Sequence, residues 1–183
     1  MARYPDLRPD EMDADQRRVF DAIVSGPRGS IGGPFPALLR SPEVCDRVQD
    51  LGRVIRFEST LPGAVRELVI LVTARHWRAQ YEWWAHSRLG LGEGLDQAVI
   101  DAVRDEDATP FGDAVLQTAR EVARSLITTG RVPEELHARA TTLLGERAVI
   151  EIVATVGYYC LVSLVLNTAE VPLPADATPL PEG

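Results

Sequence analysis

The chain has 183 residues, of which 45% are hydrophobic and 25% are charged, and its formal net charge is −8. This length and composition are typical of a single globular domain and exclude a disordered or fibrous chain. The acidic balance also disfavours partners with a phosphate backbone and anionic membrane surfaces, because like charges repel. We therefore expect no nucleic-acid partner and no membrane partner.

Cysteine usage excludes two further classes of site. Cys45 and Cys160 lie far apart in the sequence, and no C-x-x-C pair occurs. Neither a cysteine zinc motif nor a dithiol redox motif is therefore available. The first residues carry charges and contain no apolar run, which argues against a secretory signal. The expected location is the cytoplasm.

Helix signals follow one another in the first part of the chain. Asp13 and Gln16 form a capping-box pattern that predicts a helix start, and Gly26-Pro27 ends that helix. The stretch from Gly26 to Pro36 (GPRGSIGGPFP) predicts a loop. Ser41-Pro42 then predicts the N-terminus of a further helix.

The next helix is expected over residues 64–76, after Pro62. Its VILV run at 69–72 would by itself also fit a buried strand. The charged residues on both flanks and the lack of any partner strand favour a helix. Because this helix is apolar nearly all round, we expect it in the middle of a core.

Further helices are expected over 80–91, 96–104, 110–130, 134–144 and 146–168. The last carries no charge over 152–169 and approaches the length of a membrane span, but its polar residues favour a buried or subunit-facing helix. The Pro-rich segment 175–183 predicts an extended tail or an arm lying on a neighbour. The prediction is thus an all-α, oligomeric bundle of about eight helices, with one domain over 1–174.

The three histidines have different surroundings. His137 lies on a charged helix face and is expected to be solvated, whereas His76 ends a helix, where a cation complements the helix dipole. A pocket-lining role for His76 stays open. His86 follows Glu82 by one helical turn, so the two share a face. A carboxylate beside an imidazole raises its pKa and makes it a proton donor near neutral pH, although a surface ion pair is the alternative.

All three tryptophans are near this segment. Trp77 precedes it, and Trp83 and Trp84 lie between Glu82 and His86. Large rings around a charged pair would exclude water and strengthen the interaction. Filling of the core is the alternative interpretation.

Glu67 interrupts the apolar helix over 64–76. A carboxylate in such a place must be paired or have a raised pKa, and an ion pair with Arg66 or Arg75 is one explanation. If the following helix packs antiparallel, Glu67 meets Glu82 and His86 across the interface. Such a cluster handles protons without a metal. One His and two Glu could also form a metal site, but these three residues have no H-x-x-x-H or E-x-x-H spacing, and no metal is expected.

The run RELVILVTARHWRAQYEWWAHSRLG resembles the carboxymuconolactone decarboxylase and alkylhydroperoxidase D-like superfamily. Glu67 stands at the family's Glu position and His86 at its His position, with the family's spacing, while Ala79 and Glu82 occupy the two cysteine positions of the peroxidases. The segments GPRGSIGGPFPALLRSPEV and VGYYCLVSLVLNTAEVPLP resemble the longer, cysteine-free branch. The resemblance implies an all-helical bundle that assembles as a homo-oligomer, a dimer, trimer or hexamer.

The departure from the peroxidase pattern bears on activity. In the peroxidases a thiolate attacks peroxide and a second thiol resolves the sulfenic acid. Ala79 and Glu82 can do neither, and Cys45 and Cys160 are not at the motif positions. Thiol peroxidase activity, though it belongs to the family, is therefore not expected.

Resemblance to the decarboxylases implies cofactor-free acid/base chemistry on a small unsaturated organic acid or lactone. The catalytic residues would be Glu67, Glu82 and His86, with His86 as the proton donor. Isomerisation, ring opening and non-catalytic ligand binding stay open, since a fold does not define a reaction. The loop from Gly26 to Pro36 either lines the mouth of the site or is a simple connector. The expected substrate-binding residues are Arg56, Arg75, Trp77 and Trp83.

Overall fold

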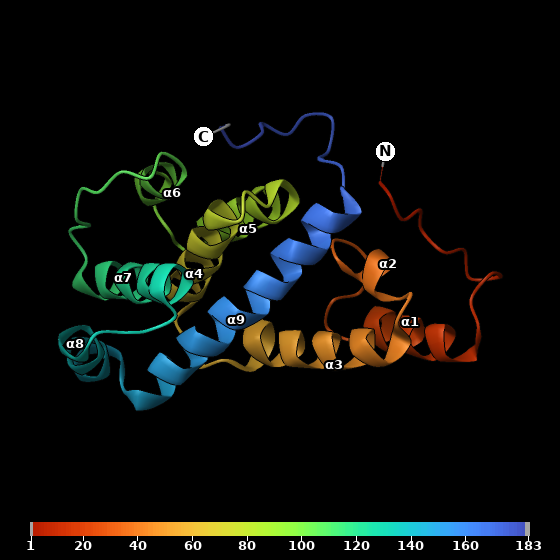
Figure 1. The fold of residues 1–183 in the computed structure, drawn as a ribbon, viewed down its shortest axis with the longest axis horizontal. Coiled ribbons are helices and arrows are strands. Elements are labelled where there is room, and N and C mark those ends of the chain that lie inside the picture. The colour runs from red at the N-terminus through yellow and green to blue at the C-terminus, as the bar shows by residue number, and fades with distance from the viewer. Residues whose placement is uncertain (1, 182–183) are drawn as a thin grey trace.

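The computed structural model describes residues 2–181, and the regular secondary structure in that range is all helical, which confirms the all-α prediction (Figure 1). A π-helical turn, Val54–Glu58 (η1), continues α3. The described residues contain no strand. The nine α-helices are α1 Ala14–Ser25, α2 Phe35–Leu38, α3 Pro42–Arg53, α4 Gly63–His76, α5 Gln80–Gly92, α6 Gln97–Arg104, α7 Ala114–Thr129, α8 Glu134–Leu144 and α9 Glu146–Ala169.

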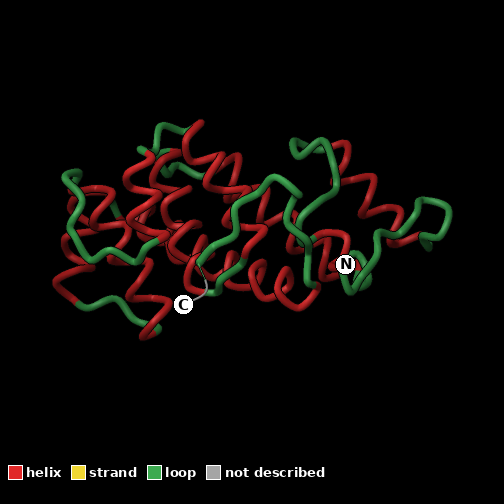
Figure 2. The backbone as a smooth tube through the Cα atoms, turned by 90° about the horizontal axis from the view of Figure 1, so that it is seen from above, coloured by secondary structure: helices red, strands yellow, loops and turns green. Residues whose placement is uncertain are grey.

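The helices form two groups that α9 joins. Helix α4 lies at the centre and packs against α5, α7 and α9. One apolar cluster is built mainly from α4 to α8 and the first half of α9, and the other from α1 to α3 and the second half of α9. Figure 1 shows α1 to α3 on one side of α9 and α6 to α8 on the other, and Figure 2 shows the same extended arrangement from above. The junction of the two groups is where a cavity forms.

Local signals account for several helix ends. The capping box of α1 is present, with the Gln16 backbone N–H donating to Asp13 Oδ1 at 2.8 Å and the Asp13 N–H donating to Gln16 Oε1 at 3.1 Å. The VILV run of residues 69–72 is helical and buried within α4. Burial on all sides explains why this segment has no polar face.

Two predicted boundaries are wrong. The loop predicted over Gly26–Pro36 ends early, because Phe35 and Leu38 bury their side chains and form the short helix α2. Helix α7 begins after Asp113 and not at Pro110, since the Asp113 carboxylate caps the N–H groups of the first turn. Asp107 accepts hydrogen bonds from the backbone and hydroxyl of Thr109 and holds the preceding segment out of the helix.

Helix α9 is long and apolar enough to cross a membrane by length and composition. Half of its most apolar window is buried inside the protein, which a core helix also produces. On the other side, Ile150 is 67% exposed, and Val153, Leu161 and Leu164 are exposed as well. The helix is therefore partly a core helix and partly an uncovered apolar face, which agrees with the buried or subunit-facing interpretation.

The C-terminal segment returns to its own chain. The Leu180 side chain is 3% exposed and belongs to the apolar cluster of α4 to α8. Its backbone N–H donates to Gln80 Oε1 at 2.7 Å, at the start of α5. The predicted tail over 175–183 is thus packed on α5 as far as it is described; residues 1, 182 and 183 of the predicted domain and tail lie outside the described range.

Candidate active site

Helices α4 and α5 bring three titratable side chains together. The chain turns tightly at Trp77–Ala79, where Arg78 has a φ of 50°, so α5 packs back along α4. His86 Nδ1 lies 2.6 Å from Glu67 Oε2, and His86 Nε2 lies 2.8 Å from Glu82 Oε1. Glu67 is 2% exposed and the other two side chains 4%. The structure therefore has the three-residue contact proposed from the sequence, and the surface ion pair is the wrong interpretation.

These contacts change the protonation of the histidine. Complete burial acts to lower the pKa of His86, but the charges and hydrogen bonds of Glu82 and Glu67 outweigh it and raise the pKa to about 9. Burial acts to raise the pKa of Glu67, yet its bond to His86 and the nearby Arg66 hold this pKa below its ordinary value. At neutral pH the cluster is an imidazolium that donates from both ring nitrogens to carboxylates.

A cavity of about 180 Å³ opens beside the cluster. Glu82 and His86 line this cavity, whereas Glu67 does not and contacts the opposite nitrogen of the ring. Five residues of the Gly- and Pro-rich loop line it, as the sequence interpretation allowed: Arg28, Ser30, Gly32, Gly33 and Pro34. The imidazole of His86 thus lies between the two carboxylates, with Glu82 on the side of the cavity and Glu67 on the side away from it.

Two tyrosines of α9 form another wall of the cavity. The Tyr159 ring meets the His86 ring edge-on at a centroid distance of 5.1 Å, and Tyr158 packs on Tyr159 in the same way. Burial raises the pKa of Tyr158 to about 12 and that of Tyr159 well above its ordinary value. Both phenols are therefore neutral hydrogen-bond donors in a sheltered site.

Arg28 places a cation in the cavity wall. Its Nε and Nη2 atoms are buried and make no well-formed hydrogen bond among the described residues; the Tyr158 hydroxyl is the polar group beside them. The guanidinium lies over the Phe35 ring at 4.7 Å, and burial lowers its pKa, although an arginine stays charged. A buried charged donor without a partner is costly, so this arrangement suits an anion arriving in the cavity. Arg56 lines the same cavity and supplies a second positive charge.

The position of these groups depends on a glycine of α3. A Cβ at Gly52 would overlap the Tyr158 hydroxyl and the Arg28 Nη2 atom. Gly52 is buried within a helix, where alanine would otherwise be the better helix former. The absence of a side chain therefore makes the space that these two polar groups occupy.

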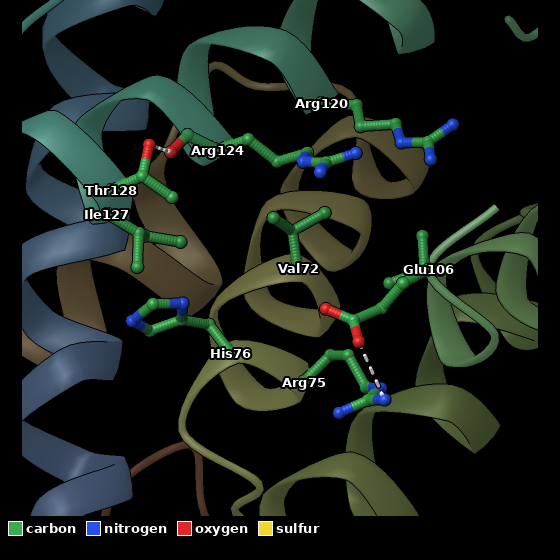
Figure 3. A pocket seen from close by; sticks show the side chains of 9 residues that line it. Val72, Arg75, His76, Glu106, Arg120, Arg124, Ile127 and Thr128 are labelled. Carbon is green, nitrogen blue, oxygen red and sulfur yellow. Dashed lines mark hydrogen bonds and ion pairs between the residues drawn. The ribbon is translucent and has the colours of Figure 1, made fainter. Parts of the chain in front are cut away.

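Three of the predicted substrate-binding residues do not line this cavity. Arg75 bonds to the Arg104 carbonyl and to Glu106 and lines a different pocket (Figure 3). Trp83 is buried in the apolar cluster of α4 to α8, and Trp77 donates from Nε1 to Cys160 Sγ at 3.2 Å. The tryptophans are thus placed by core packing, and the rings beside His86 come from α9. Arg56 is the predicted substrate-binding residue that does line the cavity.

Sequence reasoning missed Arg28, Tyr158 and Tyr159. Arg28 is the single charged residue of GPRGSIGGPFP, and the two tyrosines interrupt an uncharged helix. In each case a polar side chain lies among apolar or small residues, as Glu67 does in α4. The same pattern in the sequence could therefore have pointed to Arg28 and to the two tyrosines. His137 is exposed, as expected.

The donor set around His86 bears on metal binding. Both ring nitrogens already contact carboxylates, which leaves neither free as a ligand. Within residues 2–181, no group of three or more His, Cys, Asp or Glu side chains has an arrangement that holds a metal ion. The arrangement is suited to holding and moving a proton.

Comparisons with known proteins agree with this organisation. A structure with the same fold, titled as an uncharacterized peroxidase-related protein from Silicibacter sp. TM1040, superposes with a TM-score of 0.74 at 15% sequence identity, over 95% of this chain and 91% of that one. No curated protein matches the sequence. The model of the Carboxymuconolactone decarboxylase family matches residues 42–125. The matched segment contains Glu67, Glu82 and His86, and the match agrees with the resemblance found in the sequence.

Proposed function

We propose that the protein is a cofactor-independent acid/base enzyme that decarboxylates, isomerises or opens the ring of a small unsaturated organic acid or lactone. The observation that carries this proposal is the buried His86, held between two carboxylates at a cavity that also contains an unpaired arginine. The match of residues 42–125 to the family model supports it. The cavity of about 180 Å³ suits a small substrate.

Binding of the substrate begins with its negative charge. Arg28 lines the cavity, and a small rotation of its guanidinium would turn the buried Nε and Nη2 donors toward a substrate carboxylate, in the fork that matches such a group. Arg56 adds a second positive charge on the same cavity. A bound carboxylate would satisfy the buried Arg28 donors and hold the reacting carbon beside Glu82 and His86.

Proton transfer then uses the His86–Glu82 pair. Because the Nε2–H of His86 points at Glu82, the proton reaches the substrate through the Glu82 carboxyl at the cavity. In a decarboxylation, the carbon–carbon bond to the carboxylate breaks and CO2 leaves, while the electrons of that bond enter the conjugated carbonyl and form a dienolate. The proton held by His86 then passes through Glu82 to a carbon of the dienolate. In an isomerisation, Glu82 removes the proton from one carbon and returns it to another. The neutral hydroxyls of Tyr158 and Tyr159 are the donors for the oxyanion.

A substrate screen tests the proposal. Small keto acids, unsaturated acids and enol-lactones are incubated with the protein, and CO2 release and ultraviolet spectra are followed. We expect turnover that His86→Ala abolishes without loss of helical circular dichroism, while the exposed His137→Ala keeps full activity. Full activity in His86→Ala would exclude the assignment. Tight binding of a compound with no product over long incubation would favour a non-catalytic binding protein.

Peroxide reduction by a thiol is the alternative that the family match raises, and the cysteines do not support it. Cys45 is fully buried, and burial raises the pKa of its thiol to about 12. Neither cysteine lines the cavity of His86. We expect the Cys45→Ala/Cys160→Ala double variant to keep all activity; a peroxidase activity that this variant loses would reverse the assignment.

A homo-oligomer remains part of the proposal. The exposed apolar side chains of Ile150, Val153, Leu161 and Leu164 lie along one helix, α9, and a second copy of the chain would cover such a face. Light scattering after size exclusion should show an assembly that Leu164→Glu shifts to the monomer. A monomer in the unchanged protein would contradict this part. The cytoplasm stays the expected location.

A further inference from the structure

A second cavity lies against the first. It encloses about 330 Å³ and shares Gly32, Gly33 and Tyr81 with the cavity of His86. The rest of its lining is mostly apolar and comes from the N-terminal segment, α2 and the residues that follow α9. We call the cavity of His86 the inner chamber and this one the outer chamber.

The partition between the chambers is thin. Gly33 has a φ of 59°, and a Cβ there would lie 3.3 Å from Cε1 of Tyr81. The backbone of the Gly32–Gly33 pair therefore lies directly on the Tyr81 ring, with no side chain between them. The Tyr81 ring also packs against the Trp84 ring, at a centroid distance of 5.5 Å. One aromatic ring and two glycines thus separate the chambers.

The roof of the outer chamber is held in place. The Arg3 N–H donates to the Ala169 carbonyl at 2.8 Å, and the Arg3 guanidinium pairs with Glu170 at 2.6 Å, at the end of α9. Arg40 donates to the Pro5 carbonyl and lies over the Tyr4 ring at 5.2 Å. The N-terminal segment is therefore a bonded part of the chamber and not a loose end.

The two chambers differ in chemistry. The inner one contains two arginines, the Glu82 carboxylate and the His86 imidazole, whereas Ile31, Ala37 and Val171 are typical of the outer one. We infer that both chambers hold parts of one substrate, an organic acid whose carboxylate binds in the inner chamber and whose apolar chain displaces the Tyr81 ring and extends into the outer chamber. This inference rests on the proposed function. It makes Tyr81 and the Gly32–Gly33 pair determinants of chain-length specificity.

Binding of straight-chain saturated monocarboxylates, from propanoate to decanoate, tests the inference on the full chain by calorimetry. Each methylene group that enters the outer chamber should tighten binding by about fourfold. Ala37→Phe and Ile31→Trp, which fill the outer chamber from two elements, should weaken decanoate binding by about tenfold or more and leave propanoate unchanged. Ala138→Phe, an exposed position on α8, is the matched control and should change neither.

The outcomes separate this inference from the proposed function. If affinity in the unchanged protein is the same from propanoate to decanoate, the inference that the outer chamber binds an apolar chain is wrong, while the anion site of the proposed function stands. Equal loss of propanoate and decanoate binding in both filling variants also overturns the inference. No binding of any acid contradicts the anion site and the inference together.

Discussion

Two pockets of this protein contain the same kinds of residue and differ in how those residues are bonded. The pocket in Figure 3, of about 80 Å³, contains His76, Arg75, Arg120 and Glu106, and the inner chamber contains His86, Arg28, Arg56 and Glu82. In the first, Arg75 donates to the Arg104 carbonyl and Glu106, and Arg120 donates to the carbonyls of Asp107 and Thr109. Through these hydrogen bonds, Arg75 and Arg120 stabilise the conformation of the segment between α6 and α7. Arg28, in contrast, has two N–H donors that make no well-formed hydrogen bond with any group of the described protein. Unsatisfied donors distinguish an arginine that can bind a ligand from one that stabilises the fold.

The two histidines make the same point. His76 is exposed, and partial burial lowers its pKa with only a weak opposing effect from Glu106. The pKa of His86 moves in the opposite direction, although this ring is fully buried, because a carboxylate contacts each nitrogen. The carboxylates that contact His86 therefore raise its pKa and keep it protonated at neutral pH, although burial alone would lower that pKa.

The largest expected effect separates the two histidines. His86→Gln removes the group that exchanges the proton and should lower kcat/KM by about 10²–10⁴-fold, whereas His76→Gln should leave it unchanged. Steady-state kinetics on the substrate found by screening measures both. Equal losses in the two variants would erase the distinction.

The next largest effect is a difference between Arg28 and Arg75, one expected to act in ligand binding and the other in stability. Arg28→Met removes charged hydrogen bonds to the substrate and should weaken binding of a small carboxylate by about 10–100-fold without lowering Tm, since it also removes an unpaired buried charge. Arg75→Met should not alter that binding but should destabilise the fold by about 1–3 kcal/mol. Calorimetric titration and thermal unfolding of both variants provide the check, and a large drop in Tm for Arg28→Met would show a structural role instead.

The dependence of stability on pH is a smaller effect. The pKa of His86 is raised to about 9 in the folded protein, so its contribution to the free energy of unfolding is complete below about pH 6.5 and is lost as pH rises toward 9. The lowered pKa of Glu67 adds a contribution that is present above its ordinary range and is lost in acid. Urea unfolding between pH 6 and 9.5 should show the alkaline loss in the unchanged protein and a flatter profile in His86→Gln. Parallel profiles would mean that His86 is not held protonated.

The smallest expected effect concerns the space beside Arg28. Gly52→Ala would push on Tyr158 and Arg28 and should cost about 1–3 kcal/mol of stability, with a weaker carboxylate affinity. Gly92→Ala is the matched control, because its Cβ would meet open space at the last residue of α5 and should change stability by less than about 0.5 kcal/mol. Denaturant midpoints and carboxylate titrations of the two variants test this. Similar results for both would show that Gly52 is not needed for the arrangement.

Local rules explain what could be predicted about the site. Glu82 and His86 share a helix face because they are one turn apart, and a tight turn after α4 brings Glu67 to the same histidine. The start of α1 follows from the capping hydrogen bonds of Asp13, and the start of α8 follows from Pro133, which lacks an N–H and has a fixed φ. The family resemblance rested on the same segment, together with the loop before α3 and the last helix.

By itself, then, the sequence determined the all-helical fold, the contacts of His86 with Glu67 and Glu82 and the resemblance to the family model, because each depends mainly on residues close in the chain. Tertiary structure alone decided which arginine stays unpaired, which rings face His86 and where the chambers lie. Arg28, Gly52 and Tyr158 come from three distant segments, and their meeting depends on how α3 and α9 pack around the loop after α1. Such contacts leave no periodicity in the sequence, because a cavity is defined by the elements that surround it and not by any one of them.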